Sequence, residues 1–300
     1  MIKALVGNVS KHQLSLHGII FLWGFTGILG KLISIDSISI VWWRMTIAFI
    51  GLVAFMLATR RPLKGSVSNV VKYVFVGMIT AAHWIFFFEA IKVSNVSITL
   101  TTLASTSLFV ALIEPVFFKR KIIAYEVVFG LITIFGLGLI FQAETEYGLG
   151  ILFALISAIL AAVFSTINGI FVRYDKPTKI TAYEMLGGVI GISAYTLFNT
   201  DQVTMPVGID WLWLLLLGLV CTSMAFVVSI EVMKTLSPFT VSISINMEPI
   251  YAIIFALLIF KEDEYMSPLF YAGATIVMGT IFLNSYFKRK AQKTSEQQTD

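Results

Sequence analysis

Long apolar runs separated by short polar or charged breaks fill almost the whole chain. The runs are continuous and do not alternate between apolar and polar positions, so they favour helices over strands. Each run is long enough for a helix to cross the hydrocarbon layer, which takes about 20 residues. The pattern predicts ten spanning helices, at residues 14–33, 38–58, 71–91, 96–118, 123–142, 148–172, 181–199, 210–232, 238–260 and 267–287.

Composition supports the same class. Hydrophobic residues make up 58% of the 300-residue chain, charged residues only 13%, and the mean hydropathy is +0.90. Ordinary soluble domains carry about 25% charged residues. Lipid can hide so much apolar surface if every backbone polar group is paired within helices. We therefore expect an all-α polytopic protein with the lipid bilayer as its surroundings.

Basic residues predict the orientation. The net charge of +4 comes from short clusters in the breaks, not from one basic face, which argues against a nucleic-acid partner. With a cytoplasmic N-terminus, the inner breaks and the two terminal segments together hold 17 of the 21 Lys and Arg residues. Cytoplasmic loops are the ones enriched in Lys and Arg. Both termini should therefore be cytoplasmic, which requires an even number of spans.

The two halves of the chain are weakly similar to each other. Placing Ser107 opposite Pro249 also aligns Thr102 with Ser244 and Thr106 with Glu248. The pattern predicts one repeat over residues 1–142, a second over 143–288, and a polar cytoplasmic tail over 289–300. Because five helices per repeat is an odd number, the second repeat should be inverted in the membrane. Secondary transporters built in this way hold their substrate near the midplane, at the repeat interface.

Several short segments strengthen this interpretation: Leu22-Trp23-Gly24-Phe25 with Lys31, Trp42-Trp43-Arg44-Met45, Ser94-Asn95-Val96-Ser97, Met247-Glu248-Pro249, Ile259-Phe260-Lys261-Glu262 and Gly273-Ala274. In their order and spacing the chain resembles the EamA-type members of the drug/metabolite transporter superfamily. The resemblance implies ten helices in two inverted repeats, a bacterial inner-membrane location and export of small metabolites such as amino acids. It also implies a central cavity, with the fifth and tenth helices able to join a homodimer.

One departure from the family pattern concerns a helix break. The proline expected near position 107 is Ser107, and a proline occurs instead at Pro115. We therefore expect the break of the first repeat to lie closer to Pro115, toward the cytoplasm.

An ionisable side chain in hydrocarbon is costly, so those present usually face a cavity or a partner. The candidates that we single out on this ground are Arg44, His83, Glu89, Glu114, Glu184 and Glu248. Glu248 is the first candidate for substrate binding or coupling. It lies on a predicted stripe of one helix face, with Asn246 close by: Ser237, Thr240, Ser244, Glu248 and Tyr251. The alternative is that the hydroxyls pack helices together and that Glu248 pairs structurally with Arg44.

Other candidates come from different spans. His83 can move protons near neutral pH and Trp84 can offer an aromatic face, although a buried structural role competes for His83. Arg44 can bind a carboxylate or neutralise a buried glutamate. Glu114 is a substrate ligand, one half of a structural ion pair or part of a cytoplasmic gate. Glu89 and Glu184, near helix ends, are expected to reach toward the interface. The polar or aromatic residues that complete the predicted cavity are Thr102, Thr106, Asn168 and Trp23.

The sequence lacks a phosphate-binding Gly-Lys-Ser/Thr loop, a His-Glu-x-x-His zinc motif and a Gly-x-Ser-x-Gly nucleophile turn. We expect no cofactor, no metal and no enzyme activity. The predicted function is secondary transport of a small-molecule solute, with a proton or a counter-solute as coupling partner. Two rivals remain: an intramembrane enzyme that uses His83 with a buried glutamate, and a channel.

Overall fold

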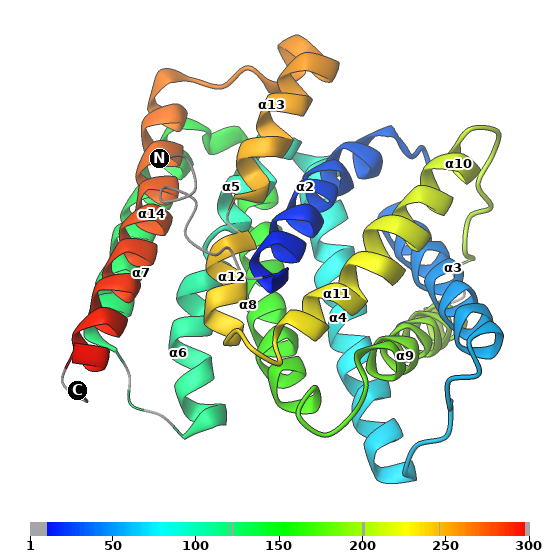
Figure 1. The fold of residues 1–300 in the computed structure, drawn as a ribbon. Coiled ribbons are helices and arrows are strands. Elements are labelled where there is room, and N and C mark those ends of the chain that lie inside the picture. The colour runs from blue at the N-terminus through cyan, green and yellow to red at the C-terminus, as the bar shows by residue number, and fades with distance from the viewer. Residues whose placement is uncertain (1–10, 120, 122, 200–201, 246, 298–300) are drawn as a thin grey trace, which may run out of the picture.

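The computed structural model describes residues 11–119, 121, 123–199, 202–245 and 247–297, and these residues form helices without a strand (Figure 1). The first half contains α2 (Lys11–Leu32), α3 (Ser37–Ala58), α4 (Val67–Val93), α5 (Val96–Leu103), α6 (Thr106–Phe118) and α7 (Ala124–Ala143). The second half contains η1 (Thr145–Tyr147), α8 (Gly148–Phe171), α9 (Pro177–Asn199), α10 (Asp210–Leu215), η2 (Leu216–Met224), α11 (Ala225–Val232), α12 (Pro238–Ile245), α13 (Glu248–Phe260), η3 (Lys261–Glu264) and α14 (Pro268–Gln297).

The helices suit a membrane. Among the described residues, seven helical segments are long and apolar enough to cross one. Shorter apolar helices cover Val127–Ala143 and Pro268–Thr280. Helices occupy every range that the sequence predicts, usually to within a few residues. The prediction of a polytopic all-helical membrane protein is thereby confirmed, while ten crossings remain a prediction.

Two spans are interrupted, and the interruptions match. Both α5 and α12 have 8 residues, and both α6 and α13 have 13 residues. Each boundary of the second pair lies 142 positions after that of the first, as Pro238 does after Val96 and Glu248 after Thr106. The two halves therefore share one pattern of half-helices.

The same hydrogen bonds form at both interruptions. Ser105 N donates to Thr102 O over 3.0 Å, and Met247 N donates to Ser244 O over 3.0 Å. These bonds span three residues, where an α-helix would span four, so the chain tightens locally into a 3₁₀-like turn.

The expected position of the first break was wrong. Pro115 lies inside the continuous helix α6, and the interruption falls at Ala104 and Ser105. Thr106 Oγ1 donates to Leu103 O over 2.7 Å, and Ser107 Oγ donates to Ala104 O over 3.1 Å. Hydroxyls that bond back to the chain in this way compete with the helical pattern, so a break needs no proline.

The predicted stripe from Ser237 to Tyr251 also needs correction. Helix α12 ends at Ile245 and α13 begins at Glu248, so the stripe does not follow one helix face. Ser244 and Glu248 lie on opposite sides of the interruption, where the turn geometry changes their relative direction.

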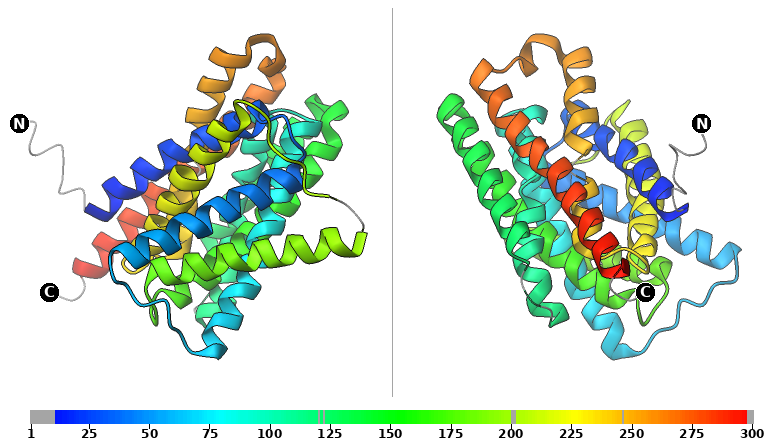
Figure 2. Two further views of the ribbon diagram at one scale, coloured as in Figure 1. Left: turned by 90° about the vertical axis from the view of Figure 1, so that its right-hand side faces the viewer. Right: turned by 60° about the vertical axis from the view of Figure 1, so that its left-hand side comes forward.

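Close helix packing shapes the bundle. Helices α7 and α14 lie along each other on one flank, and α3 and α9 lie side by side on the other (Figures 1 and 2). Helix α9 also packs against α4 at glycines. A Cβ atom added at Gly77 would lie 2.0 Å from Glu184 O, and one at Gly187 would lie 2.1 Å from Val74 O. The two backbones therefore touch.

The loops define two ends of the bundle, at the upper and lower edges of Figure 1. The Glu264 end contains residues 33–36, 94–95, 202–209 and 261–267. The Asp175 end contains residues 59–66, 172–176 and 233–237.

Candidate functional site

A central cavity lies where both interruptions meet α2, α3, α4, α8 and α11. It leaves about 110 Å³ for the centres of water molecules. One water needs roughly 10–15 Å³ on this measure, so the space suits several waters or a small organic solute. The sequence-predicted candidates that line it are Trp23, Arg44, His83, Trp84, Thr106, Asn168 and Glu248.

Two helix starts face this cavity. Thr106 is the first residue of α6 and Glu248 is the first residue of α13, and both line it. The first N–H groups of a helix lack intrahelical acceptors and carry partial positive charge. The interruptions therefore bring backbone polarity into an otherwise apolar interior.

Arg44 is the buried cation of the cavity. Its side chain is 1% exposed, and its guanidinium carbon lies 3.8 Å from the centroid of the Trp84 ring. Nε donates to Thr222 Oγ1, whereas Nη1 has no hydrogen-bond partner among the described residues. The group is thus held from one side, with donor capacity left for a ligand.

A π-helix supplies the groups that hold this side of the cavity. In η2, Thr222 Oγ1 donates to Leu217 O over 2.6 Å, five residues back. Trp23 Nε1 donates to Cys221 O over 2.9 Å. A π-helix segment widens the turn and is frequent at functional sites. Here it anchors both Arg44 and Trp23.

Glu248 is the buried carboxyl group of the same cavity. It is 6% exposed, and in the described part of the chain its carboxylate makes no hydrogen bond and no ion pair within 4 Å. Arg44 and Glu248 therefore face one cavity without touching each other. The structural Arg44–Glu248 contact considered from the sequence is not formed.

His83 is oriented by α8. Its Nδ1 lies 2.9 Å from Ser157 O, a carbonyl that can only accept, so Nδ1 carries the proton. Ser157 Oγ in turn donates to His83 O over 3.0 Å. This arrangement leaves Nε2 for the cavity. His83 makes no hydrogen bond with a carboxylate among the described residues.

Aromatic rings form much of the wall. The His83 and Phe164 ring centroids are 5.3 Å apart, and the Phe226 ring lies 5.8 Å from Phe164 and 5.7 Å from Trp84. Such rings bury apolar groups against their large surface, and they attract cations to the face of the ring.

Three further candidates, Thr102, Ser244 and Tyr251, are not among the described residues that line the cavity. Thr102 is fully buried, with Oγ1 unpartnered, and Ser244 Oγ donates to Thr240 O over 2.9 Å. Tyr251 stacks edge-on against Phe21 at 5.5 Å. Asn246 lies outside the described residues.

Glu114 has a role that the sequence did not single out. Its Oε2 accepts a hydrogen bond of 2.8 Å from Phe239 N, in the first turn of α12. Carboxylates at a helix start satisfy unpaired N–H groups and oppose the helix dipole. Glu114 therefore caps a half-helix of the other half of the chain.

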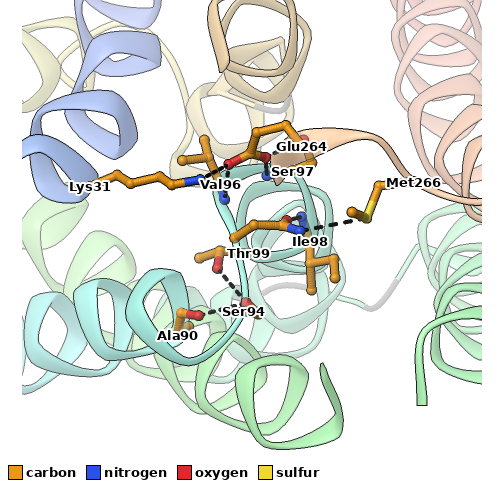
Figure 3. Close-up of polar contacts among 10 residues, drawn as sticks. Lys31, Ala90, Ser94, Val96, Ser97, Ile98, Thr99, Glu264 and Met266 are labelled. Carbon is orange, nitrogen blue, oxygen red and sulfur yellow. Dashed lines mark hydrogen bonds and ion pairs between the residues drawn. The ribbon is translucent and has the colours of Figure 1, made fainter. Parts of the chain in front are cut away.

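A matching carboxylate caps α5 at the Glu264 end. Glu264 is fully buried and accepts from Val96 N at 3.1 Å and from Ser97 N at 3.0 Å (Figure 3). Lys31 Nζ, from the last turn of α2, lies 3.0 Å from Glu264 Oε1. We call Lys31, Glu264 and the α5 start the latch, since they join three separate elements.

Glu184 was misjudged from the sequence. Expected to reach toward the interface, it is instead 0% exposed and accepts from Asn168 Nδ2 at 3.3 Å. The apolar pattern gave its depth along α9 but not its neighbours. Thr222 was also missed, because no sequence signal marks it among the hydroxyls of apolar runs. Among the described residues, no group of three or more His, Cys, Asp or Glu side chains is placed to bind a metal.

The fold and cavity define a multi-pass membrane protein whose central polar groups are enclosed by two sets of half-helices. The EamA-like transporter family model matches residues 13–142 and 148–286, so the chain belongs to this family and contains two of its repeats. A solved crystal structure shares the fold, with a TM-score of 0.69 and 17% identity, over 93% of this chain and 98% of that one. No curated protein matches the sequence.

Proposed function

We propose that this transporter exports small zwitterionic metabolites, most directly amino acids with apolar or aromatic side chains. One observation carries the proposal: Arg44 and Glu248 are both buried, face the same cavity and make no contact with each other within 4 Å. An unpaired buried charge is costly, so each gains when a ligand supplies the opposite charge.

The chemistry of the cavity favours this ligand class over a simple cation or anion. The Arg44 guanidinium can donate from Nη1 to a carboxylate, and Glu248 can accept from an ammonium group. The rings of Trp84, Phe164 and Phe226 offer apolar contacts to the side chain between these two ends.

We further propose ten spans in two inverted repeats, with both termini in the cytoplasm of a bacterium and alternating access to the cavity. The matched half-helices α5–α6 and α12–α13 support the repeat. The basic residues near the Asp175 end support its assignment to the cytoplasm, which places the Glu264 end outside. In this arrangement, the latch of Lys31, Glu264 and the α5 start closes the outer side.

Two observations favour transport over the rival functions. An acid–base enzyme would need His83 beside a carboxylate, and in the described structure His83 bonds to Ser157 instead. A channel needs a continuous path, whereas in our proposal the contacts of the latch close the outer side in this conformation.

Purified protein in lipid vesicles tests the proposal with labelled L-phenylalanine. Unlabelled L-phenylalanine inside should drive uptake of the labelled form by counterflow, and the solute should leave chemically unchanged. Glu248→Gln should lower this uptake at least tenfold at equal folded yield, whereas Tyr251→Phe, outside the cavity, should retain it. Unsaturable flux would indicate a channel, an altered product would indicate an enzyme, and wild-type kinetics in Glu248→Gln would reject the site.

A further inference from the structure

Glu184 and Asn168 form a buried pair beside the cavity. Glu184 is 0% exposed and Asn168 is 1% exposed, and Asn168 Nδ2 donates to Glu184 Oε2 over 3.3 Å. The other oxygen of each side chain, Glu184 Oε1 and Asn168 Oδ1, has no hydrogen-bond partner in the described structure. Both of these oxygens can only accept while the carboxyl is ionised.

Close helix packing surrounds the Glu184 side of this pair. Helix α4 approaches α9 so closely that a Cβ atom at Gly77 would meet the carbonyl oxygen of Glu184 itself. Glu184 makes no ion pair among the described residues. An ionised carboxylate here would be desolvated without a cation, which is strongly unfavourable.

A single proton on Glu184 provides the donor that the two unpartnered oxygens lack. A proton on Glu184 Oε1 turns this oxygen from an acceptor into a donor. The acceptor that it can reach is Asn168 Oδ1, which belongs to the same amide that already donates to Glu184 Oε2. The acid and the amide then exchange two hydrogen bonds face to face. We propose that Glu184 and Asn168 form a proton-binding site of this transporter, separate from the Arg44 and Glu248 charges.

The neighbouring elements provide a route for the proton. Tyr73 on α4 lies within electrostatic reach of both Glu184 and Asp175, and its hydroxyl donates to Asp175 Oδ2 over 3.3 Å. Asp175 in turn pairs with Lys179 over 2.9 Å at the Asp175 end. In this proposal the proton passes between Glu184 and water at that end by way of Tyr73 and Asp175.

Other charged groups on the surrounding helices are engaged elsewhere. Arg44 on α3 bonds to Thr222 and stacks on Trp84. Glu231 on α11 pairs with Lys234 at 2.8 Å. On α9 itself, the Tyr183 hydroxyl donates to Leu63 O. Tyr73, which lies within electrostatic reach of Glu184, is the titratable neighbour that we assign to the proton path.

Asn168 links this site to the cavity, because it lines the cavity while it bonds to Glu184. A solute that forms hydrogen bonds with the Asn168 amide removes Oδ1 and Nδ2 from their bonds with the protonated Glu184. Glu184 then releases its proton toward Tyr73, and rebinding of a proton restores the pair. This inference rests on the proposed transport function and adds the ion that couples to it.

Two measurements test the site. Infrared spectroscopy of the purified protein at neutral pH should show the C=O band of a protonated buried carboxylic acid, and the difference spectrum of wild type minus Glu184→Gln should contain that band. Glutamine places a carbonyl and an N–H where the protonated acid has its two groups, so this variant should fold. Glu89→Gln, on α4 away from the cavity lining, is the matched control and should keep the band.

The second measurement is the ratio of L-phenylalanine flux with a pH gradient to flux without one. Wild-type protein and Glu89→Gln should give a ratio well above one, and Glu184→Gln should give about one. A retained ratio in Glu184→Gln, or an unchanged infrared band, would overturn the proton site. Counterflow in wild-type vesicles separates the two proposals: its absence contradicts the transport function, whereas counterflow without any response to pH contradicts the proton site alone.

Discussion

Lys31 Nζ lies 3.0 Å from Glu264 Oε1, although 233 positions separate the two residues in the chain. Lys31 ends α2 in the first half, and Glu264 follows α13 in the second. Because Glu264 also accepts from the N–H groups of Val96 and Ser97, one carboxylate ties three elements together. Under the alternating access that we propose, an element that moves apart would have to break these contacts.

We therefore predict that Glu264→Gln shifts the protein toward an outward-open form. The substitution removes the charge that holds Lys31 and the α5 start, and each 1.4 kcal/mol lost changes the ratio of forms by about tenfold. In a Cys221→Ser background, Thr106→Cys should react with a membrane-impermeant maleimide added outside at least tenfold faster when Glu264→Gln is present.

The control for this experiment is Lys234→Gln, which breaks the exposed Lys234–Glu231 pair at the opposite end of the bundle. It should leave the outside labelling rate unchanged. Equal labelling in Glu264→Gln and in its parent would mean that the latch only stabilises the fold.

Arg44→Lys should weaken binding of carboxylated solutes in particular. Lysine keeps the charge but loses the planar donors that allow Arg44 to bond to Thr222 and still present Nη1. Loss of a charge-assisted bond of about 1.5–3 kcal/mol raises KM by roughly 10- to 150-fold. Phenethylamine, which lacks the carboxylate, should show no comparable loss. Arg61→Lys, at the Asp175 end, is the matched control, and an equal effect on both solutes would contradict carboxylate binding by Arg44.

Asp36 gives a prediction for pH. Burial raises the pKa of this carboxyl, but hydrogen bonds from Ser39 and Thr204 outweigh burial and leave the pKa below its ordinary value of 3.8. A lowered pKa means that the contribution to stability is present above the ordinary value and is lost as pH falls through the folded-state value.

Thermal unfolding in detergent tests this sign. The wild-type Tm should exceed that of Asp36→Asn at pH 7, and the difference should shrink as the pH falls below 4, following the ordinary pKa of about 3.9. Ser66→Ala, which removes a different N-cap, should show a pH-independent difference. A difference that grows toward acid pH would contradict the assignment.

The helices could be predicted from the sequence because the requirement is one of length and apolarity alone. Every predicted span overlaps a helix, even where α12 and α13 divide residues 238–260. The position of the first break could not be predicted from proline, since Thr106 and Ser107 satisfy the freed carbonyls with hydroxyls. That outcome depends on side-chain rotamers, which the pattern does not encode.

The candidate site divides along similar lines. Arg44, His83 and Glu248 stand out in the sequence because charges are rare in hydrocarbon, and all three line the cavity. The surroundings of Glu184 could not be predicted, because they depend on other helices: Gly77 packs against its backbone and Asn168 bonds to its carboxyl. Thr222 lies next to Arg44 only because η2 is a π-helix, which shifts the register of the residues that follow.

The matched half-helices lead to a last prediction, about a proline. Ser107 occupies the second position of α6, as Pro249 does in α13. Proline is well tolerated in the first turn of a helix, where the missing N–H leaves no helical bond unmade. Ser107→Pro should therefore fold, losing about 1 kcal/mol for the hydrogen bond from Ser107 Oγ to Ala104 O. Val110→Pro, one turn later in the interior of α6, should lose about 3 kcal/mol or more.

Thermal unfolding in detergent should show a Tm within about 4 °C of wild type for Ser107→Pro, and a fall of roughly 6–12 °C for Val110→Pro. Equal losses in both variants would mean that α6 does not begin where α13 does, and the correspondence between the two halves would fail at this point.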